Sequence, residues 1–146
     1  AGCSMGASTI MMSAQLLPEQ VKGLICDCGY SSVKGMIRAV AGKMHIPAGP
    51  AYFVLRLSAR LFGAFDPESC SALSSLAKSR IPVLIIHGED DRLVPCAMAR
   101  ENYEASASDI KMLLTVPGAG HGLSFLADEK KYRETFQDFL KKIGLL

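Results

Sequence analysis

The sequence has no charge run, no basic stripe and no long apolar stretch, and each absence removes a class of function. Because nucleic-acid-binding domains cluster Lys and Arg on one face, the near balance of 16 basic and 14 acidic residues argues against a nucleic-acid partner. A spanning helix needs about 20 consecutive apolar residues, and no segment here supplies them. Repeats, low-complexity segments and a signal peptide are also missing. The 49% hydrophobic and 21% charged residues fit one globular domain or part of one.

Cysteine is present, but not in a pattern that forms a disulfide framework. The five cysteines are odd in number and irregularly spaced, at positions 3, 26, 28, 70 and 96. The pair Cys26 and Cys28 has no second Cys or His pair at zinc-finger spacing, so a metal site is not expected. We expect reduced, buried thiols in a cytoplasmic protein that uses no metal or other cofactor.

The chain begins inside a motif, at Ala1-Gly2-Cys3, and not at a methionine. We therefore expect it to be the C-terminal part of a longer protein. A targeting or anchoring segment would then lie outside these residues, so the sequence leaves membrane attachment open.

Strand-like and helix-like segments alternate along the chain. Short apolar runs bounded by Pro or Gly predict strands at 21–28, 82–87 and 111–116. Apolar residues at helical spacing predict helices at 5–17, 32–44, 51–62, 72–79, 95–105 and 129–143. Because strands that alternate with helices form parallel sheets covered by helices, this order predicts the α/β class.

A G-x-S-x-G element, Gly2-Cys3-Ser4-Met5-Gly6, opens the first predicted helix. The motif makes a sharp strand-to-helix turn that strains the serine backbone, and we expect both glycines to be needed because a Cβ at either would clash. The Ser4 hydroxyl would project at the helix N-terminus, where the Met5 N–H could serve as an oxyanion donor. The alternative is a glycine-rich helix start with Ser4 as an ordinary N-cap.

Two further motifs follow predicted strands in the second half of the chain. HGEDDRLVP, from His87 to Pro95, places Asp91 where a carboxylate can orient an imidazole, although an acidic turn that caps a helix is the alternative. His87 itself is interpreted as a packing or hydrogen-bonding residue. GAGHG places His121 in a glycine-rich loop that can reach a serine, and its alternative is an exposed loop histidine. The order of Ser4, Asp91 and His121 along the chain favours a catalytic triad.

The segments GCSMGA, HGEDDRLVP and GAGHGLSF resemble the three signature regions of the α/β-hydrolase superfamily. DCGYSS and LADEKKY narrow the resemblance to bacterial hydrolases grouped with serine-aminopeptidase-like and prolyl-oligopeptidase-like proteins. The resemblance implies that Ser4 is the nucleophile, that Asp91 and not Asp90 is the acid, that His121 is the base, and that the Met5 N–H is one oxyanion donor.

The resemblance also implies the α/β-hydrolase fold, a mostly parallel sheet with helices on both faces. Only its strands six to eight are expected in residues 1–146, without the strand that leads into Ser4 or the loop that supplies a second oxyanion donor. Residues 33–72 are expected to form a helical cap insert over the site. Asp27 ends the strand where some relatives carry the triad acid, but we interpret it as a structural residue.

The expected activity is hydrolysis of an ester, thioester or amide of a small-molecule or short peptide acyl substrate, through an acyl-enzyme. An acyltransferase with the same triad and a non-catalytic binding member of the fold are the alternatives. Apolar residues of the insert would line an acyl pocket or, more simply, form core: Met36, Val40, Met44, Phe53, Leu57, Leu61 and Phe62. Its cations, Arg38, Arg56 and Arg60, would meet an anionic substrate or form a solvated helix face.

Overall fold

A computed structural model describes all 146 residues, and its centre is a sheet of four parallel strands. The strands lie side by side in chain order: β1 Gly2–Cys3, β2 Leu24–Asp27, β3 Val83–Gly88 and β4 Lys111–Val116. Because every neighbouring pair is parallel, the carboxyl ends of all four strands meet at one edge of the sheet. The loops that leave this edge after β1, β3 and β4 carry the three predicted site residues.

The predicted α/β-hydrolase fold class is confirmed, and the strand prediction needs one correction. The prediction of 111–116 agrees with β4 at both ends, and β3 is shifted by one residue from the predicted 82–87. β2 is shorter than the predicted 21–28, because it begins three residues later and ends one residue earlier. The strand that leads into Ser4 was expected to be missing, but β1 is present and pairs with β2, with Gly2 beside Cys26 and Cys3 beside Asp27. Two residues show no periodicity, so the sequence pattern could not reveal this strand.

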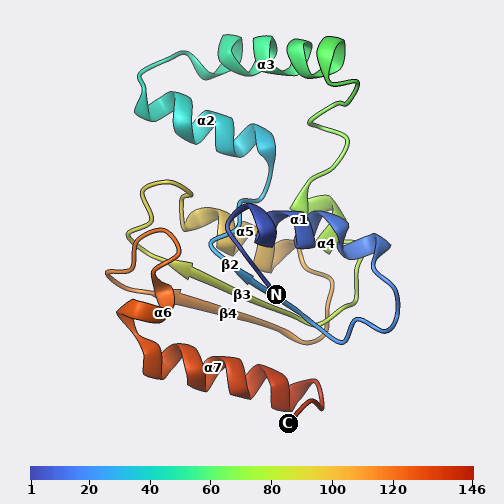
Figure 1. Cartoon of the computed structure of the whole chain (residues 1–146), viewed down its shortest axis with the longest axis vertical. Helices are drawn as coiled ribbons and strands as arrows, with labels where there is room; N and C mark the ends of the chain where they lie inside the picture. The colour runs from blue at the N-terminus through green and yellow to red at the C-terminus, as the bar shows by residue number, and fades with distance from the viewer.

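Helices cover both faces of the sheet (Figure 1). One face carries α1 Met5–Ser13, the short 3-10 helix η1 Ala14–Leu16, α4 Ala72–Leu76 and α5 Ala97–Ala105. The other carries α6 Ser124–Ala127 and α7 Glu129–Lys142. The helix α6 was not predicted from the sequence, because four residues are too few to show a helical period.

The alternation of side chains along β3 divides the core into two layers. Val83 and Ile85 pack with α1, α4 and α5 on one face, whereas Leu84 and Ile86 pack with β4 and α7 on the other. All six residues of β3 are buried, so the strand is the centre of the fold. Phe139 of α7 is fully buried in the second layer and anchors this helix to the sheet.

The helices α2 Val33–Lys43 and α3 Ala48–Phe62 form a hairpin that stands outside the α/β body (Figure 1). Ser32 caps α2 by accepting a hydrogen bond from the Gly35 N–H at 3.1 Å. The helix α3 begins three residues before the predicted start at 51. Pro50 does not interrupt it, because a proline is tolerated in the first turn of a helix. That this hairpin caps the site stays a prediction.

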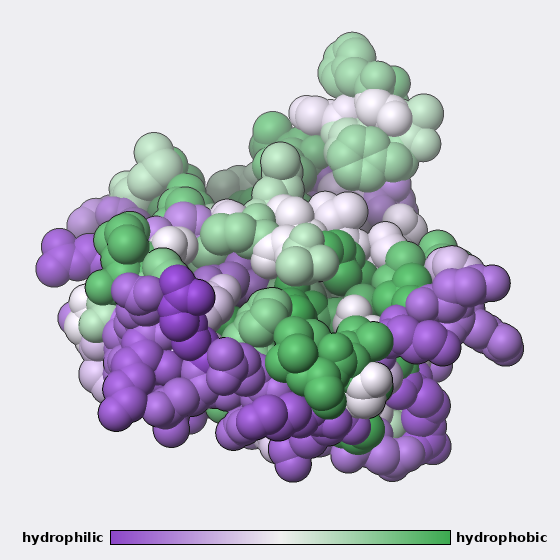
Figure 2. Space-filling model, turned by 60° about the horizontal axis from the view of Figure 1, so that its bottom comes forward, coloured by the Kyte–Doolittle hydropathy of each residue, from purple (hydrophilic) through white to green (hydrophobic).

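The outer face of α3 is apolar and uncovered. The side chains predicted as core or pocket lining on this helix are exposed, with Phe53 at 66%, Leu61 at 68% and Phe62 at 90%. Leu57 is also exposed, so the interpretation of these four residues as core is wrong. Figure 2 shows apolar residues on the part of the molecule that projects furthest from the body, at the upper right. The helices of this chain are all too short or too polar to span a membrane.

Candidate active site

Ser4 occupies the turn between β1 and α1 in a conformation that few residues adopt. Its backbone angles are φ 51° and ψ −118°, in the left-handed half of the map that disfavours residues with a Cβ. The Ser4 N–H donates to the carbonyl of Asp27 at 2.8 Å, and the Ser8 N–H donates to the Ser4 carbonyl at 3.0 Å. Strand and helix thus hold the strained residue from both sides, and its hydroxyl projects at the start of α1.

The two glycines of the motif are not equivalent. A Cβ on Gly2 would lie 2.7 Å from the Gly6 carbonyl carbon and 2.7 Å from a methyl group of Ile10, which is closer than packed atoms approach. A Cβ on Gly6 would meet nothing within 4 Å. The expectation that both positions require glycine is therefore met at Gly2 and contradicted at Gly6, where the structure has open space.

This difference gives a prediction for two matched substitutions. We expect Gly2→Ala to lower the free energy of unfolding by about 2 kcal/mol, because the added methyl displaces the start of α1. Displacing Ser4 by about 1 Å should also lower kcat/KM roughly 100-fold. Gly6→Ala should leave both quantities nearly unchanged, since alanine is the better helix former. Urea unfolding and ester hydrolysis measure the two effects, and equal damage from both substitutions would contradict the assignment of open space to Gly6.

His121 connects the serine to a buried carboxylate. Its Nε2 lies 2.8 Å from the Ser4 Oγ, and its Nδ1 lies 2.7 Å from the Asp91 Oδ2. The imidazole is a quarter exposed, whereas the Asp91 side chain is fully buried. With the Nδ1 proton donated to Asp91, Nε2 is free to accept the proton of the serine hydroxyl. The structure thus brings the three predicted residues into one hydrogen-bonded line.

The Asp91 carboxylate is held by donors on both of its oxygens. Oδ1 accepts the backbone N–H groups of Leu93 at 2.8 Å and Val94 at 2.9 Å. Oδ2 accepts from His121 and also lies 3.2 Å from Nε2 of the fully buried His87, which itself lies 3.0 Å from the Val94 carbonyl. Burial raises the pKa of Asp91, but these hydrogen bonds outweigh burial and hold its pKa below the ordinary value. The group is therefore an anion that can stabilise a protonated imidazole.

Close backbone approach positions the loop of His121 against the turn of Asp91. Gly88 ends β3, and a Cβ there would lie 2.3 Å from the Ala119 carbonyl oxygen, so only glycine fits. The Asp90 N–H donates to the same carbonyl at 3.0 Å. Asp90 itself is exposed and makes no side-chain hydrogen bond, in contrast to its neighbour Asp91.

Met5 lies at the first position of α1, where no carbonyl four residues earlier belongs to the helix. Its N–H is therefore available at the positive end of the helix, beside the Ser4 hydroxyl. That it serves as an oxyanion donor stays a prediction. The Met5 side chain is 71% exposed and takes no part in this arrangement.

The five cysteines are free, and two of them lie near the serine. Cys3 and Cys28 approach with their Sγ atoms 3.4 Å apart, a contact of thiols and not a bond. The pKa of Cys28 and that of Cys26 are both raised to about 12, and burial is the largest cause in each case. The thiols of Cys26 and Cys28 are therefore protonated and poor nucleophiles.

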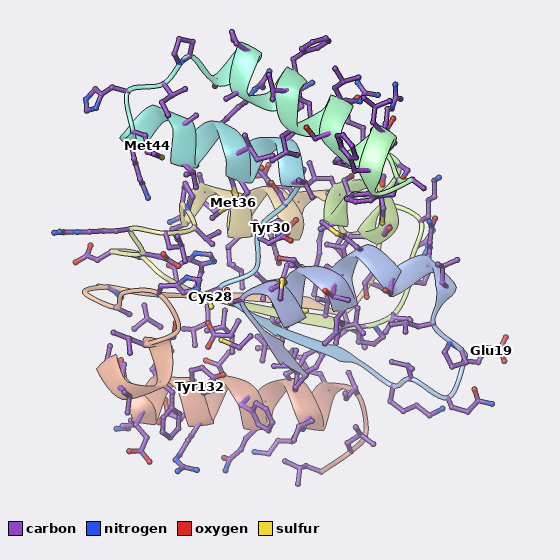
Figure 3. The ribbon with its side chains drawn as sticks, turned by 45° about the horizontal axis from the view of Figure 1, so that its top comes forward. Glu19, Cys28, Tyr30, Met36, Met44 and Tyr132 are labelled. Atoms are coloured by element: carbon purple, nitrogen blue, oxygen red, sulfur yellow. The ribbon has the colours of Figure 1, made fainter.

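Cations of the hairpin form ion pairs with acidic residues of the same chain. Arg56 and Arg60 both bind Asp66, and these contacts hold the pKa of Asp66 well below its ordinary value. Between α2 and α3 lies a groove of about 280 Å³ lined by eight apolar residues, among them Met36, Val40 and Met44. Figure 3 shows Met36 on α2 and Met44, which directly follows the last residue of that helix.

Two residues next to the site gave no signal in the sequence. Ser124, fully buried, donates from Oγ to the Asp27 Oδ1 at 3.3 Å, and the Tyr132 hydroxyl of α7 lies near this carboxylate. Tyr132 is one of the apolar residues whose helical spacing predicts the helix at 129–143, and that spacing indicates only packing. The ring of a tyrosine can pack in a hydrophobic stripe while its hydroxyl makes a polar contact, and sequence spacing does not distinguish the two roles.

Solved structures of several hydrolases share this fold. An esterase of Pyrococcus furiosus, Pf2001, aligns with 97% of this chain and 51% of its own, at a TM-score of 0.67 and 21% identity. The monoacylglycerol lipase of Paleococcus ferrophilus aligns with 97% of this chain and 66% of its own, at a TM-score of 0.68 and 15% identity. Such low identities establish the common fold and no more.

Sequence comparison finds relatives that are longer than this chain. The uncharacterized protein YqkD of Bacillus subtilis is 26% identical over 145 residues, which are 98% of this chain and 47% of that protein. The human protein ABHD12B is 37% identical over 67 residues, which are 42% of this chain and 18% of its own length. The chain thus spans about half or less of the length of the curated relatives it matches.

A family model described as serine aminopeptidase, S33, matches residues 48–128. The matched stretch is just over half of the 146 residues and runs from α3 to the end of α6 and the residue after it. It includes Asp91 and His121, whereas Ser4 precedes it. The predicted resemblance is confirmed at this level: the chain belongs to the serine aminopeptidase S33 family of α/β-hydrolases.

Proposed function

We propose that the protein is a serine hydrolase that cleaves an ester, thioester or amide bond through an acyl-enzyme on Ser4. The observation that carries the proposal is the unbroken pair of short hydrogen bonds from Ser4 to His121 and from His121 to Asp91. Membership of a hydrolase family agrees with it. A non-catalytic binding protein would have no use for a strained serine aligned with a base and a buried acid.

The proposed reaction has two steps. In the first, His121 accepts the proton of Ser4 as its oxygen attacks the carbonyl carbon, and the leaving group departs with that proton. In the second, His121 takes a proton from water as the water oxygen attacks the acyl carbon, the bond from that carbon to the Ser4 oxygen breaks, the carboxylic acid leaves, and His121 returns the proton to Ser4. Asp91 keeps the proton of Nδ1 in place and stabilises the imidazolium formed in each step. The Met5 N–H would donate to the oxyanion.

The test uses the protein as its gene encodes it and a series of p-nitrophenyl esters with acyl chains of graded length. We expect saturable hydrolysis that stops after treatment with a fluorophosphonate, with one adduct on the peptide that contains Ser4. Release of p-nitrophenol that survives complete modification of Ser4, or an adduct on another peptide, would place the activity elsewhere. A thiol or alcohol added as acceptor separates hydrolysis from acyl transfer, because transfer alone would yield the new ester or thioester.

A further inference from the structure

Asp27 is a buried carboxylate that the proposed reaction does not use. It ends β2, next to β1 and β3, and is 8% exposed. Its backbone carbonyl accepts the Ser4 N–H at 2.8 Å, so the main chain of Asp27 fixes the strained turn of the nucleophile. The interpretation of Asp27 as a simple strand-end residue does not explain why an ionisable group occupies this place, since an asparagine or serine would leave that main-chain contact intact.

The side chain of Asp27 reaches towards the loop of the base. Oδ1 accepts from the Oγ of Ser124, the first residue of α6, at 3.3 Å. Ser124 follows His121 by three residues, and its own side chain is fully buried. On the α7 side, the Tyr132 hydroxyl lies near the same carboxylate. Figure 3 shows Tyr132 on α7 below Cys28, which directly follows Asp27. One residue therefore links the nucleophile through its main chain and the base loop through its side chain.

The charged and titratable groups around Asp27 come from every element packed against it. They are His87 on β3, His121 in the loop after β4, Tyr132 on α7, and the thiols of Cys3 and Cys28. The two histidines act to lower the pKa of Asp27. Burial first, and the Asp27 charge second, raise the pKa of Tyr132 to about 12, so the tyrosine stays a donor.

Ionisation of Asp27 does not favour folding. Burial is the largest influence on the pKa of Asp27 and raises it, in spite of the hydrogen bond from Ser124 and the nearby Tyr132 hydroxyl, which lower it. A carboxyl group whose pKa is higher in the folded state binds its proton more firmly there, so its contribution to stability falls as the pH rises from the unfolded to the folded pKa. A group that is unfavourable for stability and lies beside a candidate active site is typical of a functional role.

We propose that Asp27 is a positioning residue, whose carboxylate holds the loop of His121 in line with Ser4 and whose charge favours protonation of the imidazole during the reaction. The inference rests on the proposed function. It differs from a triad role, because Asp91 alone contacts His121 Nδ1. Ser124 is the donor through which the carboxylate acts on this loop.

The test compares Asp27→Asn with Ser124→Ala and with Asp138→Asn, which removes an exposed carboxylate of α7 and serves as the control. Asp27→Asn should lower kcat roughly 10-fold to 100-fold with little change in KM, as is typical when an outer partner of a reacting group is lost. The acid limb of its kcat/KM profile should move to lower pH by about half a unit, because a nearby negative charge is removed. Ser124→Ala keeps the charge, so it should lower kcat without moving the limb. Asp138→Asn should match the wild type.

Thermal unfolding at pH 8 distinguishes this role from a structural one. The Asp27→Asn protein should unfold at the wild-type temperature or higher, since a buried charge is removed. A lower unfolding temperature with an unmoved acid limb would show that Asp27 only supports the fold and would overturn the proposal. A loss of kcat as large as that of Asp91→Asn would make Asp27 the triad acid and would also overturn it. If the wild type lacks Ser4-dependent turnover, the proposed function fails first; normal turnover in Asp27→Asn refutes the positioning role alone.

Discussion

Replacing Ser4 by Ala is expected to abolish both ester hydrolysis and covalent labelling by a fluorophosphonate. The Ser4 hydroxyl lies 2.8 Å from Nε2 of His121, and alanine leaves no nucleophile to attack the carbonyl. In serine proteases the loss of the nucleophile lowers kcat by about 10⁶-fold, and we expect a loss of that order here. Labelling is measured by intact-protein mass spectrometry and turnover by p-nitrophenol release.

A matched control for this result is Ser58→Ala, which removes an exposed hydroxyl from α3. It should label and turn over like the wild type. The folded state of Ser4→Ala is checked by urea unfolding, which should show equal or greater stability because alanine removes a polar group from a strained site. Labelling that persists in Ser4→Ala would mean that another residue is the nucleophile, and the proposed function would have to be rebuilt around it.

Asp91→Asn is expected to produce the second largest loss, about 10⁴-fold in kcat, which is the effect of the comparable substitution in a serine protease. The asparagine amide can donate to Nδ1, which favours the imidazole tautomer that carries its proton on Nε2. That nitrogen then cannot accept the proton of Ser4. Asp90→Asn is the control, because Asp90 is the neighbouring carboxylate and is exposed. Near-normal turnover is expected for it.

The same pair of variants also reports on stability. The lowered pKa of Asp91 means that its ionised form is favoured in the folded state, so its contribution is present above the unfolded pKa and is lost as the pH falls through the folded pKa. Asp91→Asn should therefore lower the unfolding temperature at pH 7. In strong acid, the difference in unfolding temperature between this variant and the wild type should become smaller. An Asp90→Asn protein as inactive as Asp91→Asn would contradict the choice of acid.

The sequence was sufficient for the parts of the fold that have a strong local pattern. β4 and α7 begin and end where the apolar pattern of each segment begins and ends, to within one residue. Asp91 and His121 follow strands as predicted. Ser4 was predictable because a short motif describes one unusual turn. Where the pattern is short, as in the two residues of β1 and the four of α6, propensity has no period on which to act, and pairing with neighbours in space decides the structure.

Other features depend on which neighbours lie in space. Gly2 and Gly6 are alike in the motif, but only a Cβ on Gly2 meets another part of the chain. The apolar residues of α3 have the spacing of a core helix, yet the exposed side of the helix carries them, because periodicity shows which residues share a face and not what covers that face. The contact of Asp27 with Ser124 joins residues 97 positions apart, a distance at which no local pattern exists.

The arrangement of the strands in chain order has a consequence for biosynthesis. Each strand can pair with the edge of the strand before it during translation. Ser4 and His121 are separated by 117 positions. At about 5–20 residues per second, the serine emerges roughly 10 s before the histidine that would activate it. During this interval the turn at Ser4 and the helix α1 can form without a base, so the nascent chain would carry an inert hydroxyl. Under the proposed function, Ser4 would become reactive only after β4 pairs with β3 and brings His121 to the serine.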